Sequence, residues 1–283
     1  MSMEIKVLDI GDIELDSSFL VLARDPGRIA RVPTFSYLIT GGSDLLLVDT
    51  GYRNIEIMER LGMRGIQTRE QVLDNALARH GVKMSDIRYI LHTHLHIDHA
   101  GKDDLFPNTT TVAVNRRELE YAVSGLMGAQ YPPEDVKHLI DRLHTRNALR
   151  LLDLAGSGGE EIIPGVVCVA AGAHTEGSMN ILVETAQGTA CICGDVVYDV
   201  YDQIVEPLHQ INEMEPATTG NHGTAKRAEK AAIKQALNSG TFLLPMHDFP
   251  AVIDRGRVIG RLHETVPGPM APVKKENRNW FPA

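Results

Sequence analysis

The sequence predicts a layered α/β domain in which helices lie outside β-sheets. Apolar runs of strand length alternate along the chain with amphipathic helical patterns. Three of these runs end directly on a side chain that can bind a metal ion: residues 87–93 lead into His94, 189–194 into Asp195 and 241–246 into His247. Strands that end on such side chains predict a functional site at one edge of a sheet.

Two further β patterns accompany these three strands. Residues 166–171 form another apolar run, which stops shortly before His174. Residues 180–185 and 189–194 flank the short loop 186–188 (AQG), and this arrangement is typical of a β-hairpin.

Two segments carry the pattern of an amphipathic helix, and each precedes a strand that ends on a candidate ligand. Residues 68–81 open with a Thr68/Gln71 capping box and end at Gly81. Residues 224–240 repeat the pattern and also end at a glycine. The apolar faces consist of Val72, Leu73, Ala76 and Leu77 in the first segment and of Ala228, Ala231, Ala232, Ala236 and Leu237 in the second.

The composition predicts one domain over residues 1–283. A hydrophobic content of 43% suffices for one large core, and no linker is visible. Residues from about 118 to 154 look helical and are interrupted by Pro132-Pro133, so we expect a helical insertion that covers the site. The tail after about residue 267 is rich in proline and irregular.

Charge and hydropathy restrict the partners. A net charge of -9 disfavours nucleic-acid phosphate and anionic membranes, since neither would meet a positive field. The N-terminal residues lack an apolar stretch behind basic residues, and nowhere do about 18 apolar residues run together. We therefore expect a soluble, cytoplasmic protein. Cys168, Cys191 and Cys193 lie within β-like runs, where a small buried hydrophobe is the expected role.

Three histidines and an aspartate occupy the short segment 94–99 (HLHIDH). His94 and His96 are two apart on nearly extended chain, so their rings point to the same side and can share one ion. Asp98 and His99 are adjacent and follow where the strand has ended, so they project towards a second position nearby. The segment therefore offers half of two metal sites.

Three residues further along the chain can complete these sites. A catalytic zinc typically takes three or more protein ligands and leaves a place for water. His174, in a glycine-rich turn, can complete the first site, and His247 the second. Asp195 has two carboxylate oxygens at the end of a buried strand, which suits a bridge between both ions. Two ions about 3.5–4 Å apart can hold one hydroxide and polarise a carbonyl.

The alternative for each histidine is an ordinary surface or core imidazole. That interpretation is favoured for an isolated histidine, but without a metal the group would hold several unpaired polar side chains at about 1–3 kcal/mol each. His92 also forms a His-x-His pair with His94, but Asp98-His99 sets the register at His94 and His96. The ordinary role is kept for the other seven: His80, His92, His138, His144, His209, His222 and His263.

Residues 93–101 (THLHIDHAG), followed in order by His174, Asp195 and His247, resemble the metallo-β-lactamase superfamily. The resemblance spans residues from about 33 to 250 and implies an αββα sandwich with the metal site at one edge of two facing sheets. Residues 45–51 (LLLVDTG) resemble the family's early strand and Asp-Thr-Gly turn, in which Asp49 would be a structural residue behind the ligands. Such a motif set is specific for the fold and only weakly specific for the substrate.

Within the superfamily the chain looks most like the N-acylhomoserine lactonases, which quench bacterial signalling. The phrases HLHIDHAG, VNRRELEYA and HTEGSMNILVET carry the likeness, together with Tyr198 three residues after Asp195. The likeness implies a dinuclear metal-dependent hydrolase that opens a lactone ring, with Tyr198 holding the substrate carbonyl and Asp98 passing a proton to the leaving alkoxide. It also implies a small-molecule substrate, and a homodimer is common among the relatives.

The same likeness assigns the ligands residue by residue. One ion would be held by His94, His96 and His174, the other by Asp98, His99 and His247, with Asp195 bridging them. Zinc is favoured for both ions, and manganese, iron or cobalt also suit nitrogen and oxygen ligands.

The chain departs from the family pattern in places that concern the substrate. Gly101 is followed by Lys102 instead of a second glycine, and the usual Gly-His-x-Pro-Gly-His turn reads AHTEGS over residues 173–178. Residues 23–39 also resemble the N-terminal part of pyridoxolactonase, which opens an aromatic lactone. The arginines of this segment would line the mouth and meet a polar or anionic substrate, or else form a solvated loop: Arg24, Arg28 and Arg31.

Other activities share parts of this pattern. An alternative is hydrolysis of another cyclic ester or amide, or a glyoxalase II-type thioesterase whose glutathione site would draw on Lys274, Lys275 and Arg278. A redox enzyme of the persulfide dioxygenase type would use one iron and would not need Asp98 and His247 as ligands. The acidic charge disfavours a nuclease or phosphodiesterase. A catalytically silent binding module is disfavoured because every ligand position is filled.

Overall fold

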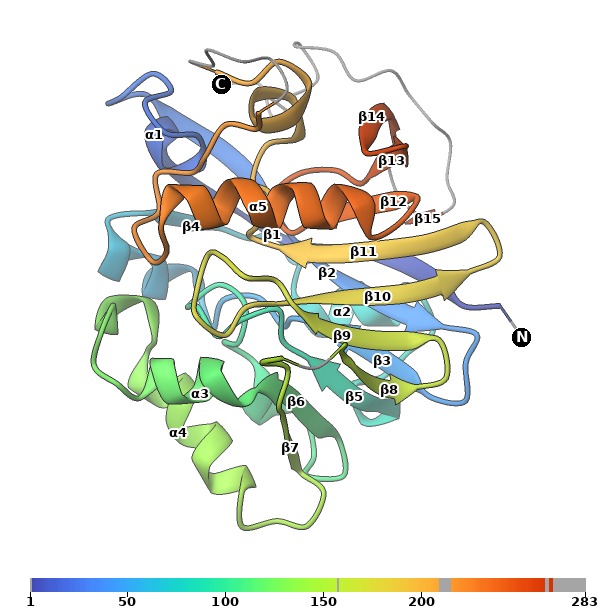
Figure 1. Ribbon diagram of the computed structural model, residues 1–283. Helices are drawn as coiled ribbons and strands as arrows, with labels where there is room; N and C mark the ends of the chain where they lie inside the picture. The colour runs from blue at the N-terminus through green and yellow to red at the C-terminus, as the bar shows by residue number, and fades with distance from the viewer. Residues whose placement is uncertain (1, 157, 209–214, 263–264, 267–283) are drawn as a thin grey trace.

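The computed structural model describes residues 2–156, 158–208, 215–262 and 265–266. Two mixed β-sheets lie face to face, and helices cover their outer faces (Figure 1). The α/β fold class predicted by the sequence, an αββα sandwich of the metallo-β-lactamase type, is therefore confirmed.

In the first sheet, the strand that precedes HLHIDH lies next to the strand that precedes Asp49. Its order is β15 (Thr265–Val266), β1 (Glu4–Asp16), β2 (Ile29–Thr40), β3 (Leu45–Val48), β5 (Ile87–Leu91), β6 (Thr111–Asn115) and β7 (Leu149–Leu152), and β4 (Arg64–Ile66) pairs with β1. The strands β3, β5, β6 and β7 pair in parallel. Asp49 and the ligand motif therefore leave the sheet at the same edge.

The second sheet gathers the other three ligand segments. Its order is β14 (Arg257–Arg261), β13 (Ala251–Asp254), β12 (Phe242–Pro245), β11 (Gly188–Gly194), β10 (Met179–Thr185), β9 (Val166–Ala170) and β8 (Glu160–Ile163). β11 and β12 are parallel, and β9 runs in the same direction because both β9 and β11 are antiparallel to β10. The predicted hairpin is confirmed, since Thr185 pairs with Gly188.

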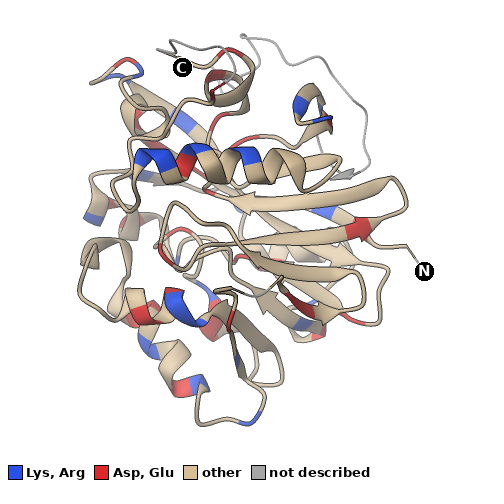
Figure 2. Ribbon diagram, viewed as in Figure 1, with Lys and Arg blue, Asp and Glu red and all other residues tan. Residues whose placement is uncertain are grey.

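Among the described residues, five α-helices lie outside the sheets: α1 (Ser17–Leu20), α2 (Leu73–Ala78), α3 (Arg116–Ala122), α4 (Pro133–Arg142) and α5 (Lys226–Asn238). α5 packs on the second sheet through the predicted Ala232 and Ala236, and also through Ile233, whereas the predicted Ala231 is exposed. Residues of α2, α3 and α4 pack with the outer face of the first sheet. Figure 2 shows that charged residues are frequent on α3, α4 and α5 and sparse on β9, β10 and β11.

The helix predicted over residues 68–81 is shorter in the structure. Gln71 Oε1 accepts a hydrogen bond of 2.9 Å from the Thr68 amide, as in a capping box, but α2 begins only at Leu73. The Gln71 side chain also donates to Asp9 Oδ1 on β1 at 2.8 Å. Because this hydrogen bond fixes Gln71 to the sheet, the residues before Leu73 form turns and not helix.

The insertion predicted over residues 118–154 is only partly helical. Pro133 begins α4 instead of interrupting a helix, because the first helical position needs no amide donor. The end of the segment forms β7, which pairs with β6, and this part belongs to the sheet. A single domain over residues 1–283 stays a prediction, and the tail predicted after residue 267 lies outside the described residues.

The main core fills the space between the two sheets and contains Phe35, Tyr37, Ile181 and Leu244. All three cysteines are free and buried, as their strand context predicts. Burial raises the pKa of Cys168 and Cys191 to about 12, so these thiols stay protonated.

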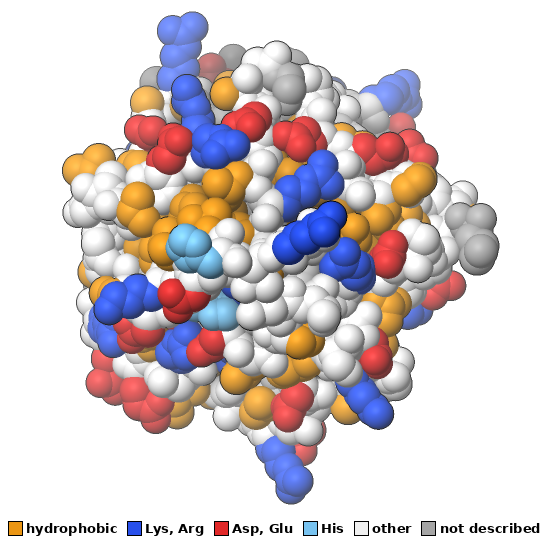
Figure 3. All heavy atoms as spheres, turned by 90° about the horizontal axis from the view of Figure 1, so that it is seen from below, with side chains coloured by type: hydrophobic (Ala, Val, Ile, Leu, Met, Phe, Trp, Pro, Cys, Tyr) orange, Lys and Arg blue, Asp and Glu red, His pale blue; other side chains and the backbone are white. Residues whose placement is uncertain are grey.

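On the face drawn in Figure 3, acidic and basic side chains are interspersed with apolar ones. Among the described helices, none is long and apolar enough to span a bilayer. The cytoplasmic location and the homodimer stay predictions.

Candidate metal centre

The seven predicted ligands converge at the edge of the sandwich. Their ligand atoms form three overlapping groups, within each of which all atoms lie within 4.8 Å of one another. The groups are His94, His96 and His174; His94, His99 and Asp195; and Asp98, His99 and His247. Four loops at the strand ends supply them.

The first group consists of three imidazoles that face one another. His174 Nε2 lies 3.0 Å from His94 Nε2 and 3.1 Å from His96 Nδ1. Burial lowers the pKa of His94 and His96 well below 6.5 and that of His174 to about 4. The three rings are therefore neutral, and they can direct lone pairs at one cation.

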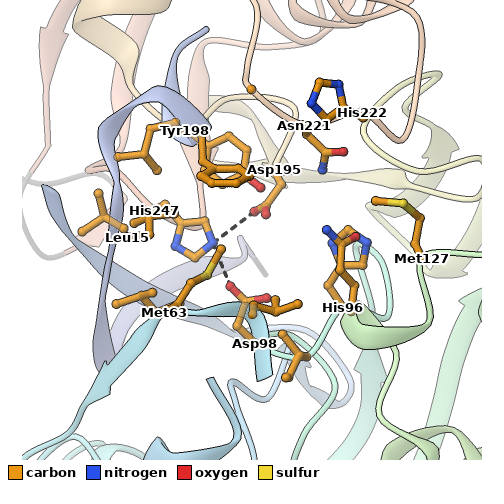
Figure 4. A pocket seen from close by; sticks show the side chains of 18 residues that line it. Leu15, Met63, His96, Asp98, Met127, Asp195, Tyr198, Asn221, His222 and His247 are labelled. Atoms are coloured by element: carbon orange, nitrogen blue, oxygen red, sulfur yellow. Dashed lines mark ion pairs between the residues drawn. The ribbon is translucent and has the colours of Figure 1, made fainter. Parts of the chain in front are cut away.

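The other two groups mix imidazoles with carboxylates. Figure 4 shows that His247 faces both carboxylates: its Nε2 lies 3.3 Å from Asp98 Oδ2 and 3.4 Å from Asp195 Oδ1. His99 Nε2 lies 3.3 Å from the same Asp195 oxygen. The other oxygen, Asp195 Oδ2, lies 3.5 Å from His174 Nε2. Asp195 therefore turns one oxygen to each side, as a bridging ligand would.

The donor set fits divalent cations. Among the described residues, neither His99 Nε2 nor Asp195 Oδ1 has a hydrogen-bond partner, although both atoms are buried. A buried polar atom without a partner costs about 1–3 kcal/mol, and a cation between the two would remove that cost. Burial works against the charge of His247, yet the Asp195 and Asp98 carboxylates raise its pKa to about 10, which shows that these oxygens stabilise positive charge here.

Asp49 lies behind the ligands, where the early-strand resemblance predicts a structural residue. It directly follows β3 with a left-handed backbone, at a φ of 58°. Its Oδ2 accepts from Thr93 Oγ1 at 2.6 Å and lies 2.8 Å from His99 Nδ1, and its Oδ1 accepts from the Thr93 amide at 2.9 Å. A carboxylate at Nδ1 keeps the proton there and leaves Nε2 free as a ligand.

Tyr198 lies beside His247, in the group that also contains Asp98 and His99. Its ring is stacked on that of His247, with centroids 5.3 Å apart and planes inclined by 11°. Burial, together with the carboxylates of Asp195 and Asp98, raises the pKa of Tyr198 well above 10. The hydroxyl therefore stays protonated and can donate a hydrogen bond.

A cavity of about 220 Å³ opens on these groups. In Figure 4 Tyr198, His247 and Met63 stand on one side of it, and His96 and Met127 on the other. Most of the other lining is apolar: Ile13, Leu15, Phe19, Leu20, Val32, Leu61, Met63, Ile97 and Met127. Among the described lining residues there is no lysine or arginine. The segment predicted to cover the site contributes Met127 and Gln130.

The three arginines predicted at the mouth do not line this cavity, so that prediction is wrong. Arg24 is buried and its Nη1 lies 2.5 Å from Asp199 Oδ2 and 2.9 Å from Asp202 Oδ2. Arg31 pairs with Asp12 at 2.6 Å, and exposed Arg28 lies 3.9 Å from Asp25. Arg24 and Arg31 are therefore paired with carboxylates of the protein itself, outside the cavity.

Glu118 is a buried residue that the sequence did not single out. Its Oε1 accepts from the Leu95 amide at 2.9 Å and from Tyr131 Oη at 3.0 Å, and its Oε2 accepts from Thr175 Oγ1 at 2.5 Å. It thereby joins the loop of His94 and His96 to the loop of His174. Its position within the VNRRELEYA phrase was the available signal.

Asn221 and His222 also reach the site. Asn221 Nδ2 lies 3.1 Å from His174 Nδ1, and both residues line the cavity. The sequence predicts an ordinary surface or core imidazole for His222, because an isolated histidine in a loop has no ligand pattern around it. No local pattern marks Asn221.

Comparisons with known proteins agree with this geometry. The family model described as the metallo-beta-lactamase superfamily matches residues 29–247. An N-acyl homoserine lactonase of Bacillus cereus is 31% identical over 184 residues, which cover 62% of this chain and 68% of that protein. One from Bacillus thuringiensis is 29% identical over 199 residues, covering 66% and 73%.

Solved structures show the same fold. A quorum-quenching N-acyl homoserine lactone hydrolase superposes with a TM-score of 0.64 at 24% identity and covers 83% of this chain and 86% of its own. AidC, a dizinc quorum-quenching lactonase in complex with a product, gives a TM-score of 0.62 at 17% identity, covering 96% and 95%. This chain is a metal-dependent hydrolase that belongs to the metallo-beta-lactamase superfamily.

Proposed function

We propose that this chain opens the lactone ring of an N-acyl homoserine lactone with two divalent cations, for which zinc is favoured. One observation carries the proposal: Asp195 lies between His174 and His247, and the candidate ligands around it open directly into a mainly apolar cavity beside Tyr198. The relatives named N-acyl homoserine lactonases and the dizinc neighbour support it.

Each ion would have its own ligands. His94, His96 and His174 would hold one, Asp98, His99 and His247 the other, and Asp195 would contact both. When bound, two such cations lower the pKa of water to about 7 and polarise the carbonyl that is attacked.

The side chains of the cavity perform the remaining steps. The Tyr198 hydroxyl donates a hydrogen bond to the lactone carbonyl oxygen as negative charge develops on it, a contribution of about 3–4 kcal/mol. Water adds to the carbonyl carbon, and the bond from that carbon to the ring oxygen breaks. Asp98, which lines the cavity, passes one proton of the water to the ring oxygen, and the second proton leaves to the solvent. The product is an acyl homoserine with a free hydroxyl and a carboxylate.

The lining of the cavity bears on the substrate class. The apolar residues suit an acyl chain, because burying each CH₂ group contributes about 0.8 kcal/mol. A glutathione thioester or an anionic aromatic lactone would favour a lysine or arginine in the lining, and the described lining residues include neither. Lys274, Lys275 and Arg278, on which the thioesterase alternative relies, lie outside the described residues.

Metal content and a substrate panel test the proposal. We would measure metal per chain by elemental analysis and hydrolysis of N-hexanoyl homoserine lactone, pyridoxolactone and a glutathione thioester. Two ions per chain, with ring opening of the acyl lactone that is lost in Asp195→Ala, is the expected result. Two ions with cleavage of only another substrate would reject the substrate class. One iron per chain would reject the hydrolytic mechanism.

A further inference from the structure

His92 is buried next to the metal centre, yet it belongs to none of the three ligand groups. We infer that His92 and Asp103 are positioning residues, which hold Asp49 against His99 and so keep His99 Nε2 aimed at the second ion. The inference rests on the proposed two-ion site. It is carried by a continuous series of buried side-chain contacts, which runs from Asp103 through His92 and Asp49 to His99.

Both ring nitrogens of His92 face a carboxylate. Nδ1 lies 3.1 Å from Asp49 Oδ1, and Nε2 lies 2.8 Å from Asp103 Oδ2. The side chains of His92 and Asp49 are fully buried, and that of Asp103 is 2% exposed. Each carboxylate can accept a hydrogen bond from the ring nitrogen that it faces, so the His92 ring is held from both sides.

The contacts of Asp49 hold its side chain in place. Its backbone is left-handed, so its side chain stays in place through these contacts rather than through a favoured local conformation. His92 and the Thr93 amide hold Oδ1, and this leaves Oδ2 directed at His99 Nδ1. If the Asp49 side chain moved, His99 would lose the carboxylate that orients its ring.

The other end of the chain of contacts is also anchored. Asp103 Oδ1 accepts from Thr50 Oγ1 at 3.0 Å. The carbonyl of Asp103 accepts from Arg142 Nη2 at 2.9 Å, and Arg142 also donates to the carbonyls of Phe106 and Thr110 at 2.9 Å each. Arg142 ends α4, so this helix supports the loop that presents Asp103. His92 is therefore held between the end of β3 and a loop fixed by a helix.

Cobalt titration of the metal-free, full-length protein tests the inference. Co²⁺ binding would be followed by its visible absorption, in competition with a chelator, for wild type and for His92→Gln and Asp103→Asn. Asp103→Asn keeps the size of the side chain and removes its charge, so it serves if His92→Gln does not fold. We expect two Co²⁺ per wild-type chain. In both variants the second Co²⁺ should bind about 10- to 100-fold more weakly, with the first unchanged.

Thr111→Val is the matched control. It removes a partly buried hydrogen bond of 2.6 Å from Thr111 Oγ1 to the Asn147 carbonyl, at the start of β6 and away from the ligands. It should lower stability and leave both Co²⁺ affinities unchanged.

Three results would overturn the inference in different ways. If the variants bind both Co²⁺ ions as tightly as wild type, His92 and Asp103 do not position the ligand. If both ions weaken in proportion to lost stability, the two residues are structural only. If wild type binds a single Co²⁺, the proposed two-ion function fails, and the inference fails with it.

Discussion

Lys102 buries its amine beside the motif, at the position where the family pattern has a glycine. Its Nζ has no hydrogen-bond partner among the described residues, and it lies 5.7 Å from the centre of the Tyr52 ring. Burial lowers the pKa of Lys102 to about 8, because the charged form is poorly solvated. The amine therefore reduces the stability of the fold.

Lys102→Met should raise the free energy of unfolding by about 1–3 kcal/mol at pH 7, since a thioether of similar length needs no partner. The unfolded chain holds its lysine proton up to a pKa of about 10.4, so the native state binds fewer protons between pH 8 and that value. The penalty is complete below pH 8 and disappears as the pH rises through this window. Urea unfolding of both proteins at pH 7 and pH 10 measures the difference. An equal gain at both values would contradict this account.

Tyr198→Phe should lower kcat for the acyl lactone by about 100-fold or more, because one hydrogen-bond donor to the developing oxyanion is lost. The stacking on His247 remains available to phenylalanine, so the metal content should not change. Steady-state kinetics with elemental analysis separate the two effects. A variant with full activity would exclude Tyr198 from the chemical step.

At the scale of elements, Glu118 links α3 to two ligand loops. Glu118→Gln should destabilise the protein by about 1–3 kcal/mol, since the NH₂ of the amide would face either the Leu95 amide or the Thr175 hydroxyl, and one of these donors would lose its acceptor. It should also weaken the ion held by His94, His96 and His174, while the other ion is retained. Co²⁺ titration and thermal unfolding test this, with Glu120→Gln, exposed on the same helix, as the control. Equal effects of the two variants would refute the linking role.

Arg24 joins the segment after α1 to the turn that follows Tyr198. Arg24→Gln leaves Asp199 and Asp202 without this guanidinium, and breaking a buried ion pair costs about 3–5 kcal/mol. We expect lower stability and a lower kcat, through displacement of the Tyr198 turn. Arg28→Gln, in the same segment but exposed, should change neither stability nor KM. A higher KM in Arg28→Gln would restore a substrate role for this segment.

At the scale of the whole molecule, the metal centre lies where the two sheets meet at their edge. Ions that bind only the native state stabilise it by about 2.7 kcal/mol at a concentration of 100 times Kd. Removing them with a chelator should therefore lower Tm by several degrees, and added zinc should restore it. Calorimetry of wild type and Asp195→Ala checks this, because the variant should lose most of the dependence on zinc. A Tm that is independent of metal would mean that the ions do not stabilise the native state.

Much of the fold follows from local patterns. Alternating apolar runs predicted β5, β9, β11 and β12, and an alanine-rich face predicted α5. The ligands could be identified because they directly follow strands, and parallel strands bring their ends to one edge. The hairpin between β10 and β11 was also predictable from a local pattern, because a short loop that contains glycine between two apolar runs is typical of a hairpin. The boundaries of α2 and β7 were not predictable from local patterns. Contacts with distant segments set them: Gln71 bonds to Asp9 on β1, and β7 pairs with β6.

By itself the sequence indicated the layered α/β class and the seven candidate ligands, because apolar runs of strand length and the side chains near their ends are local patterns. The structural place of Asp49 came from the likeness of LLLVDTG to the metallo-β-lactamase superfamily. The tertiary structure decided which residues face the cavity and which face each other. Arg24 meets Asp199 across 175 positions, and Glu118 meets Thr175 across 57. No local pattern encodes such pairs, because they form only when the strands have been placed. The buried chain of contacts from Asp103 to His99 depends on the fold for the same reason.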